Sequence, residues 1–105
     1  MPLPLKWEFP GGKVEPNESE KSCLIREILE ELNLVIDNLE RLPSNCHAFN
    51  DGKTIELIPF RCQVADGIIQ LKEHQQIKWV TKEDLLFLDW AEADIPIVEY
   101  YKNHF

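Results

Sequence analysis

The sequence predicts an α/β or α+β domain in which a mixed β-sheet is sandwiched between helices. Two observations carry this prediction. Strand-like segments at residues 45–49 and 54–64 flank an Asp-Gly hairpin signal, and helix-capping patterns recur at separate places along the chain. A chain of 105 residues supports one hydrophobic core, so we expect a single domain over residues 1–105.

The N-terminal part is expected to contain a short strand, a turn and a helix. Leu5–Phe9 is the strand, and the Pro-Gly-Gly at 10–12 must turn because these residues interrupt regular structure. Asn17, with Glu20 three residues later, predicts an N-cap and its capping-box partner. The helix then extends to about residue 32, with Asn33 as a left-handed C-cap.

The middle of the chain is expected to be extended. Residues 34–36 begin a strand, and the Asp-Gly at 51–52 joins the strands at 45–49 and 54–64. Pro59 inside the second of these implies an edge or a bulge. Apolar residues at 58, 60, 62 and 64 alternate with other residues, which predicts one buried face. Residues 65–67 are expected to make a second tight turn into a strand at 68–71.

The C-terminal part is expected to contain one more strand and two helices. Residues 78–80 form the strand, and Thr81 caps a helix that extends to about residue 86, with Asp84 three residues after the cap. Asp94 caps the last helix, with Pro96 tolerated in its first turn.

Composition restricts the classes of partner. Eleven basic and nineteen acidic residues give a formal charge of −8, which argues against a nucleic-acid polymer but not against a small phosphorylated ligand bound through a cation. No signal-peptide pattern and no apolar run of membrane-spanning length occurs, so we expect a cytoplasmic protein with no membrane partner. The three cysteines have no zinc-site spacing and are expected to be reduced and mostly buried.

The predicted first helix carries acidic residues along one face. At helical spacing, Glu27, Glu30 and Glu31 share a narrow arc, Glu20 joins them, and no Lys or Arg lies within the arc. Such carboxylates repel one another by about 0.2–0.5 kcal/mol per pair. The apolar residues at 24, 25, 28, 29 and 32 cluster on the opposite side, which should face the core. A solvated Glu-rich face is the ordinary interpretation, but the Gly-Gly at 11–12 before the helix favours a divalent-cation site.

Here the sequence resembles the Nudix hydrolases. The motif of that family reads Gly, five residues, Glu, seven residues, then Arg-Glu-apolar-x-Glu-Glu-x-Gly-apolar. The corresponding positions of this chain hold Gly12, Glu18, Arg26, Glu27, Ile28, Glu30, Glu31, Asn33 and Leu34. Only Asn33 departs from the motif, and the fold should survive the change because Asn tolerates positive φ.

The resemblance extends over about residues 7–101, toward the MutT-type branch, which acts on 8-oxo-dGTP or CTP-like substrates. Trp7–Glu15 is similar to the approach segment of that branch, and Glu73 has the spacing of its additional acidic ligand. The segment at 88–98 is similar to its base-recognition segment, which places Asp94 at a base-contacting position. Members usually have an inner strand before the approach segment. Only six residues precede Trp7, so we expect that strand to be missing or supplied by another chain.

The resemblance implies a set of metal ligands. Glu27, Glu30, Glu31 and the carbonyl of Gly11 would bind Mg²⁺, with Mn²⁺ as an alternative ion, and Glu73 would be a further ligand, a base or simply a solvated acid. Glu27 could instead be the general base that deprotonates water.

Other residues are implied to orient carboxylates or to contact the substrate. Arg26 would orient carboxylates, including Glu18. Lys13 contacts phosphate or is solvated, Phe9 borders a base-stacking pocket or belongs to the core, and Asp94 reads a base, caps a helix or does both.

The implied reaction is attack of metal-activated water on a nucleoside triphosphate, such as 8-oxo-dGTP, to release the monophosphate and pyrophosphate. Two alternatives stay open: a Nudix hydrolase for another diphosphate, such as ADP-ribose or a dinucleotide, and an inactive Nudix fragment. The protein would act as a monomer or a homodimer.

Overall fold

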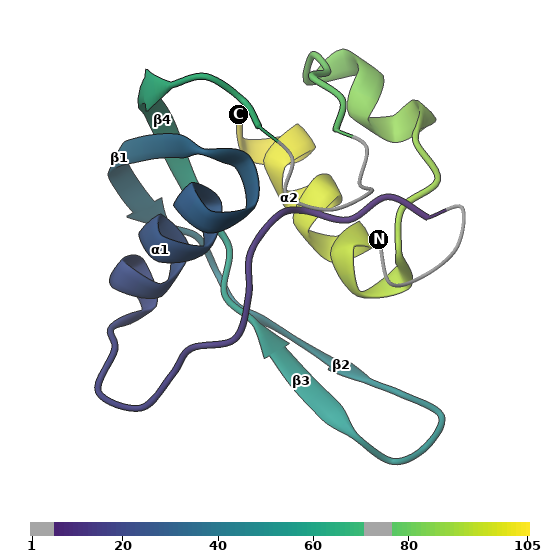
Figure 1. The fold of residues 1–105 in the computed structure, drawn as a ribbon. Helices are drawn as coiled ribbons and strands as arrows, with labels where there is room; N and C mark the ends of the chain where they lie inside the picture. Colours follow the sequence, from purple (N-terminus) through teal and green to yellow (C-terminus); the bar gives the residue numbers. More distant parts are fainter. Residues whose placement is uncertain (1–5, 71–76) are drawn as a thin grey trace. The chain divides into compact units, whose positions relative to one another are not determined.

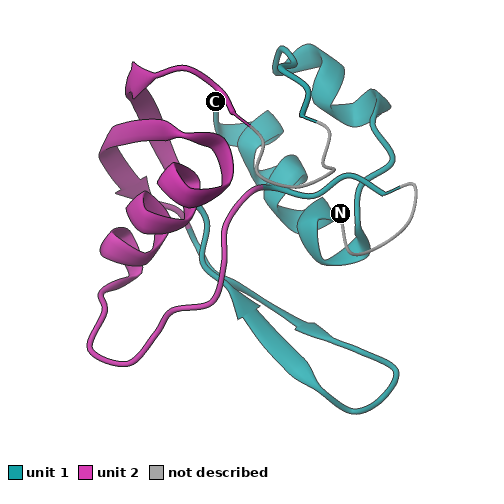
Figure 2. Ribbon diagram, viewed as in Figure 1, with its two compact units in different colours: residues 1–9, 43–59, 77–105 teal, residues 10–42, 60–76 magenta. Residues whose placement is uncertain are grey.

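A computed structural model describes residues 6–70 and 77–105, and it divides into two compact units, which are coloured separately in Figure 2. Unit 1 contains residues 1–9, 43–59 and 77–105, and unit 2 contains residues 10–42 and 60–76. Glu73 lies outside the described residues. The expected strand at 68–71 is wrong over its described part, because residues 68–70 have no regular structure. Within the described part, every helix is too short or too polar to cross a membrane.

Unit 2 begins with a loop and helix α1, Glu20–Leu32 (Figure 1). The N-cap is Ser19, whose hydroxyl accepts a hydrogen bond from the Ser22 N–H at 3.1 Å. The predicted cap at Asn17 is therefore wrong: this residue has φ 65° and lies in the turn that precedes the helix. The predicted C-cap is confirmed, because Asn33 is left-handed with φ 58° and its N–H donates to the Leu29 carbonyl at 3.0 Å.

After α1 the chain forms strand β1, Leu34–Arg41, which pairs antiparallel with β4, Phe60–Gly67. The register contains two irregularities, and Asn38 adopts φ 52° within the second. The predicted turn at 65–67 is wrong, because these residues continue β4. Gly67 has φ +108°, and a Cβ there would lie 2.3 Å from the Asn33 carbonyl oxygen. Close backbone approach at the end of α1 thus explains this glycine.

The core of unit 2 lies between α1 and β1. Ile28, Leu34 and Ile36 are buried there, with Leu24, Leu32, Leu39 and Ile69 packed around them. Two parts of the predicted apolar pattern are wrong. On α1, Ile25 and Leu29 are 38% and 46% exposed. On β4, the face that was expected to be buried is exposed at Cys62 and at Val64, and Val64 is 50% exposed. Within the described residues β4 pairs only with β1, so its other edge has no strand partner there.

Unit 1 contains a hairpin of β2, Asn45–Ala48, and β3, Thr54–Leu57, joined through the predicted Asp-Gly turn. The expected single strand at 54–64 is instead divided at residues 58–59. Proline has no N–H to donate to a ladder, and the residues beyond Pro59 pair with β1 rather than β2. Cys46 is exposed here, so only Cys23 of the three free cysteines is buried as predicted.

The rest of unit 1 is mostly helical. It contains two 3₁₀ helices, η1 (Glu83–Phe87) and η2 (Glu92–Asp94), and helix α2 (Ile95–His104), which carries Pro96 in its first turn as predicted. Thr81 accepts the Asp84 N–H at 3.3 Å, but the helix that follows is of the 3₁₀ type.

Neither flanking strand forms as expected. The strand at 5–9 is reduced to a parallel bridge between Trp7 and Trp90, and residues 78–80 have no regular structure. The α+β class is confirmed, with antiparallel sheets and two α-helices.

Candidate metal and nucleotide-binding residues

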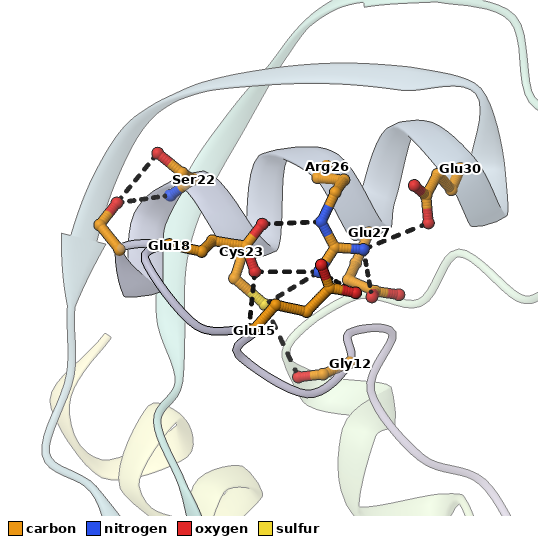
Figure 3. Close-up of polar contacts among 9 residues, drawn as sticks. Gly12, Glu15, Glu18, Ser22, Cys23, Arg26, Glu27 and Glu30 are labelled. Carbon is orange, nitrogen blue, oxygen red and sulfur yellow. Dashed lines mark hydrogen bonds and ion pairs between the residues drawn. The ribbon is translucent and has the colours of Figure 1, made fainter.

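The loop before α1 is held against the helix by polar contacts, which Figure 3 shows. The Glu15 N–H donates to one carboxylate oxygen of Glu18 at 3.0 Å, which closes a short turn around Asn17. The buried Cys23 thiol lies 3.9 Å from the Gly12 carbonyl oxygen. These contacts place the glycine of the motif beside the side chains of α1.

Gly12 leaves room for a carboxylate. A Cβ at this position would lie 2.3 Å from the Glu27 Cδ and 2.5 Å from each of its carboxylate oxygens. Any larger residue would therefore have to displace the Glu27 side chain. The requirement for glycine here is steric, and it seats Glu27 against the loop backbone.

Arg26 lies at the centre of the acidic residues (Figure 3). Its Nε and Nη2 donate to the two oxygens of Glu18 at 2.7 and 3.0 Å, which is a bidentate pair. Its Nη1 donates to Glu27 Oε1 at 2.8 Å and to Glu30 Oε2 at 3.4 Å. A fourth carboxylate, Glu15, lies 3.8 Å from Nη2. No Lys or Arg lies within the acidic arc, but the long Arg26 side chain reaches it and contacts the next residue and the residue one turn later.

These contacts fix the charge states in the cluster. The Arg26 hydrogen bond, helped by the Glu15 N–H and opposed by burial, lowers the pKa of Glu18 to about 2. The same pairing raises the pKa of Arg26. Burial, together with the charge of Glu18, raises the pKa of the Cys23 thiol. At neutral pH the Arg26–Glu18 pair is therefore ionised, and the Cys23 thiol is uncharged.

The structure brings together only some of the predicted metal ligands. Glu27 and Glu30 meet at one guanidinium nitrogen. Glu20, expected in the same arc, instead pairs with Arg41 of β1 at 3.0 Å. In residues 6–70 and 77–105, no group of three or more His, Cys, Asp or Glu side chains has the arrangement of a metal site. Gly11, Glu31 and Glu73 as ligands stay predictions, and Glu73 lies outside the described residues.

The donor set nevertheless fits a divalent cation. Oxygens of Glu27 and Glu30 both lie within 3.4 Å of the positively charged Nη1, so this nitrogen marks a point that two carboxylates already surround. Carboxylate oxygens are the hard ligands that Mg²⁺ prefers, usually together with water and substrate phosphate. The space that a Cβ of residue 12 would fill is what admits Glu27 to this place.

Unit 1 carries the residues predicted to contact a base. The ring of Phe9 stacks on Trp90, with centroids 4.6 Å apart and planes 22° from parallel. Phe9 is 38% exposed, so it does not belong to the core. The Trp90 indole N–H donates to the Leu85 carbonyl at 2.7 Å, which fixes that ring. The stacking of Phe9 on Trp90 was not predicted, since nothing in the sequence links two aromatics so far apart.

Asp94 is buried, with 8% of its surface exposed. It occupies the N-cap position of α2, but its side chain makes no capping hydrogen bond, so the predicted capping role is wrong. Burial raises its pKa to about 6, while a hydrogen bond from the Phe9 backbone opposes the shift and the charge of Glu8 adds to it. Lys13, by contrast, is exposed and makes no ion pair with any described residue.

Comparisons with known proteins show which family the chain resembles. The family model described as the NUDIX domain matches residues 2–101. The chain is 38% identical over 95 residues to the CTP pyrophosphohydrolase of Escherichia coli, covering 90% of this chain and 70% of that protein. It is 35% identical to the putative 8-oxo-dGTP diphosphatase 2 of Mycobacterium tuberculosis, covering 85% of this chain and 63% of that protein.

A solved structure agrees as well. The solution structure of MutT from methicillin-resistant Staphylococcus aureus matches with a TM-score of 0.73 and 39% identity, over 98% of this chain and 78% of that one. The family model covers nearly the whole chain, and the carboxylates of its motif lie around Arg26. The chain therefore belongs to the Nudix hydrolase family.

Proposed function

We propose that this chain hydrolyses nucleoside triphosphates to the monophosphate and pyrophosphate with the help of Mg²⁺. The observation that carries the proposal is the convergence of Glu27 and Glu30 on one point beside Gly12. Nudix hydrolases generally use a divalent metal, and relatives of this chain bear the names CTP pyrophosphohydrolase and 8-oxo-dGTP diphosphatase. These names favour a triphosphate over a dinucleotide.

The residues of the cluster would have different roles in binding and catalysis. Bound Mg²⁺ supplies charge neutralisation at the phosphates and a more acidic water. Glu27 and Glu30 would hold the ion, or Glu27 would instead accept the proton of the attacking water. Arg26 would orient these carboxylates until the ion binds, and it is itself held by Glu18, which stays ionised because its pKa lies at about 2. Lys13, exposed on the loop, would meet a phosphate as a point charge.

We assign base recognition to unit 1. The stacked rings of Phe9 and Trp90 offer an aromatic face, since Phe9 keeps 38% of its surface exposed. The side chain of Asp94 is not used in helix capping. With a pKa near 6, Asp94 can accept a hydrogen bond from a base as a carboxylate or donate one when protonated. We propose an oxidised purine nucleotide such as 8-oxo-dGTP as the substrate, and CTP is the alternative.

The test is a panel of substrates with purified protein and Mg²⁺: 8-oxo-dGTP, dGTP, CTP, dCTP, ADP-ribose and NADH. We expect pyrophosphate release from triphosphates, lost with EDTA and reduced at least about a hundredfold in Glu30→Gln. Glu20→Gln is the matched control on the same helix, since Glu20 pairs with Arg41 away from the cluster, and it should keep wild-type turnover. Preference for ADP-ribose or NADH, or no turnover of any compound by folded protein, would overturn the proposal.

A further inference from the structure

We infer that Arg26 occupies the place between Glu27 and Glu30 that a divalent cation takes when it binds, and that Glu18 retains the guanidinium during the exchange. Arg26 is thus a positioning residue whose Nη1 lies where two predicted metal ligands converge. The inference rests on the proposed function, because it assigns Glu27 and Glu30 to the cation.

The contacts of Arg26 are unequal at its two ends. At one end, Nε and Nη2 bind both oxygens of Glu18 at 2.7 and 3.0 Å, and the Glu18 side chain is only 15% exposed. At the other end, Nη1 is shared between Glu27 at 2.8 Å and Glu30 at 3.4 Å. The Glu30 side chain is 58% exposed, so its long contact is the weaker of the two that Nη1 makes. The guanidinium is therefore anchored at Glu18 and readily released at Glu30.

Nη1 and a cation compete for the same oxygens. A magnesium ion needs carboxylate oxygens at about 2.1 Å, far closer than a hydrogen-bonding nitrogen allows. The ion and the guanidinium also repel each other if both stay between Glu27 and Glu30. Since Glu18 and Glu15 lie on the other side of the guanidinium, Arg26 keeps partners when Nη1 withdraws. The exchange leaves no charge unpaired.

The arrangement also offsets repulsion among the carboxylates of the cluster. Glu15, Glu18, Glu27 and Glu30 all lie within 3.8 Å of Arg26. Without a cation these like charges repel, and one guanidinium that bridges them reduces the repulsion. Gly12 keeps Glu27 at this place whether nitrogen or metal occupies it, because the space against the loop backbone is open only without a Cβ.

The exchange is tested by isothermal titration calorimetry. Mg²⁺ alone, without nucleotide, is added to the wild-type protein and to variants, and its affinity is measured. Removing the competitor in Arg26→Gln should tighten Mg²⁺ binding by about tenfold, as for the loss of one competing charged hydrogen bond. The matched control is Arg41→Gln. It breaks the ion pair between Arg41 of β1 and Glu20 of α1, and it leaves Glu27 and Glu30 unchanged. We expect its affinity to change less than about twofold, since exposed charges act weakly at a distance. Unchanged or weaker binding by Arg26→Gln overturns the inference.

Nitrogen NMR of the wild-type Arg26 side chain provides a readout that needs no variant. On addition of Mg²⁺ the Nη1 resonance should shift, because it loses Glu30, while the Nε resonance should stay close to its metal-free position in contact with Glu18. An unmoved Nη1 under saturating Mg²⁺, or equal shifts of both nitrogens, would overturn the exchange. If Arg26→Gln fails to fold, this measurement on the wild-type side chain decides the inference by itself.

Failure of the inference and failure of the proposed function give different patterns. If Glu27→Gln and Glu30→Gln weaken Mg²⁺ binding but Arg26→Gln does not tighten it, the cation site stands and the exchange is wrong. If neither glutamate variant alters Mg²⁺ binding, the site itself is wrong, and the exchange falls with it. Tighter binding by Arg26→Gln that disappears in the double variant with Glu30→Gln supports both.

Discussion

The roles of single residues in this chain depend on which residues lie close to them in the folded structure. Arg26 could be placed in the motif from the sequence, but its position between Glu18 and Glu30 follows from the fold of the preceding loop. Asp94 shows the same dependence. A helix N-cap was the local explanation for this residue, yet its carboxyl group is buried without capping α2 and meets the backbone of Phe9 instead. Local sequence cannot reveal burial that distant segments impose.

The raised pKa of Asp94 makes stability depend on pH. Its folded-state pKa of about 6 exceeds the ordinary value of 3.8, so the unfolded chain releases this proton first as the pH rises. The free energy of unfolding should therefore fall between about pH 4 and 6, by on the order of 1–3 kcal/mol from this group. Asp94→Asn keeps an oxygen to accept the hydrogen bond and removes the titration. We expect the variant to gain stability over wild type at pH 7 but not at pH 3.5.

Urea unfolding of both proteins at several pH values measures the difference. Asp89→Asn is a suitable control, because Asp89 is an exposed aspartate of the same unit, 67% accessible and paired with Lys6. A stability difference between wild type and Asp94→Asn that is constant from pH 3.5 to 7 would show that the Asp94 carboxyl ionises normally.

At the level of helices and strands, the sequence was informative where the signal is local. The left-handed Asn33 and the Asp-Gly hairpin turn were both predicted, since each depends on the conformational preferences of one or two residues. The division at Pro59 was not, because the apolar alternation continues through it while the pairing partner changes from β2 to β1. Gly67 was taken for a turn residue, although the approach of the Asn33 carbonyl is what requires it. Both the division of the strand at Pro59 and the need for glycine at position 67 depend on tertiary contacts.

The start of α1 offers a test at this level. Ser19→Ala should destabilise the protein by about 1 kcal/mol, because the Ser22 N–H loses its acceptor. Ser22→Ala keeps that N–H and serves as the control, with a cost of no more than a few tenths of a kcal/mol. Asn17→Gly should be tolerated, since its φ of 65° suits glycine. Thermal or urea unfolding measures all three, and an equal loss in Ser19→Ala and Ser22→Ala would contradict the assignment of the cap.

For the whole molecule, the dominant property is its charge of −8, part of which is gathered around Arg26. Composition alone could predict the need for a cation near any phosphate, and the motif could predict which glutamates supply it. The motif also implied that Arg26 orients carboxylates, but neither could predict that its Nη1 lies between Glu27 and Glu30. The consequence is that metal binding and folding are coupled: an ion that binds only the folded cluster must stabilise the protein.

Mg²⁺ should therefore raise the melting temperature of the protein by more than screening of its negative charge explains. With a dissociation constant of about 1 mM, 10 mM Mg²⁺ adds about 1.4 kcal/mol, or about 5 °C for a chain of this size. Sodium chloride at matched ionic strength controls for relief of the overall negative charge. Glu27→Gln should lose the specific part of the shift, whereas Glu20→Gln, whose partner is Arg41, should retain it. Equal shifts with both salts would mean that the acidic residues of α1 bind the ion no better than the rest of the surface does.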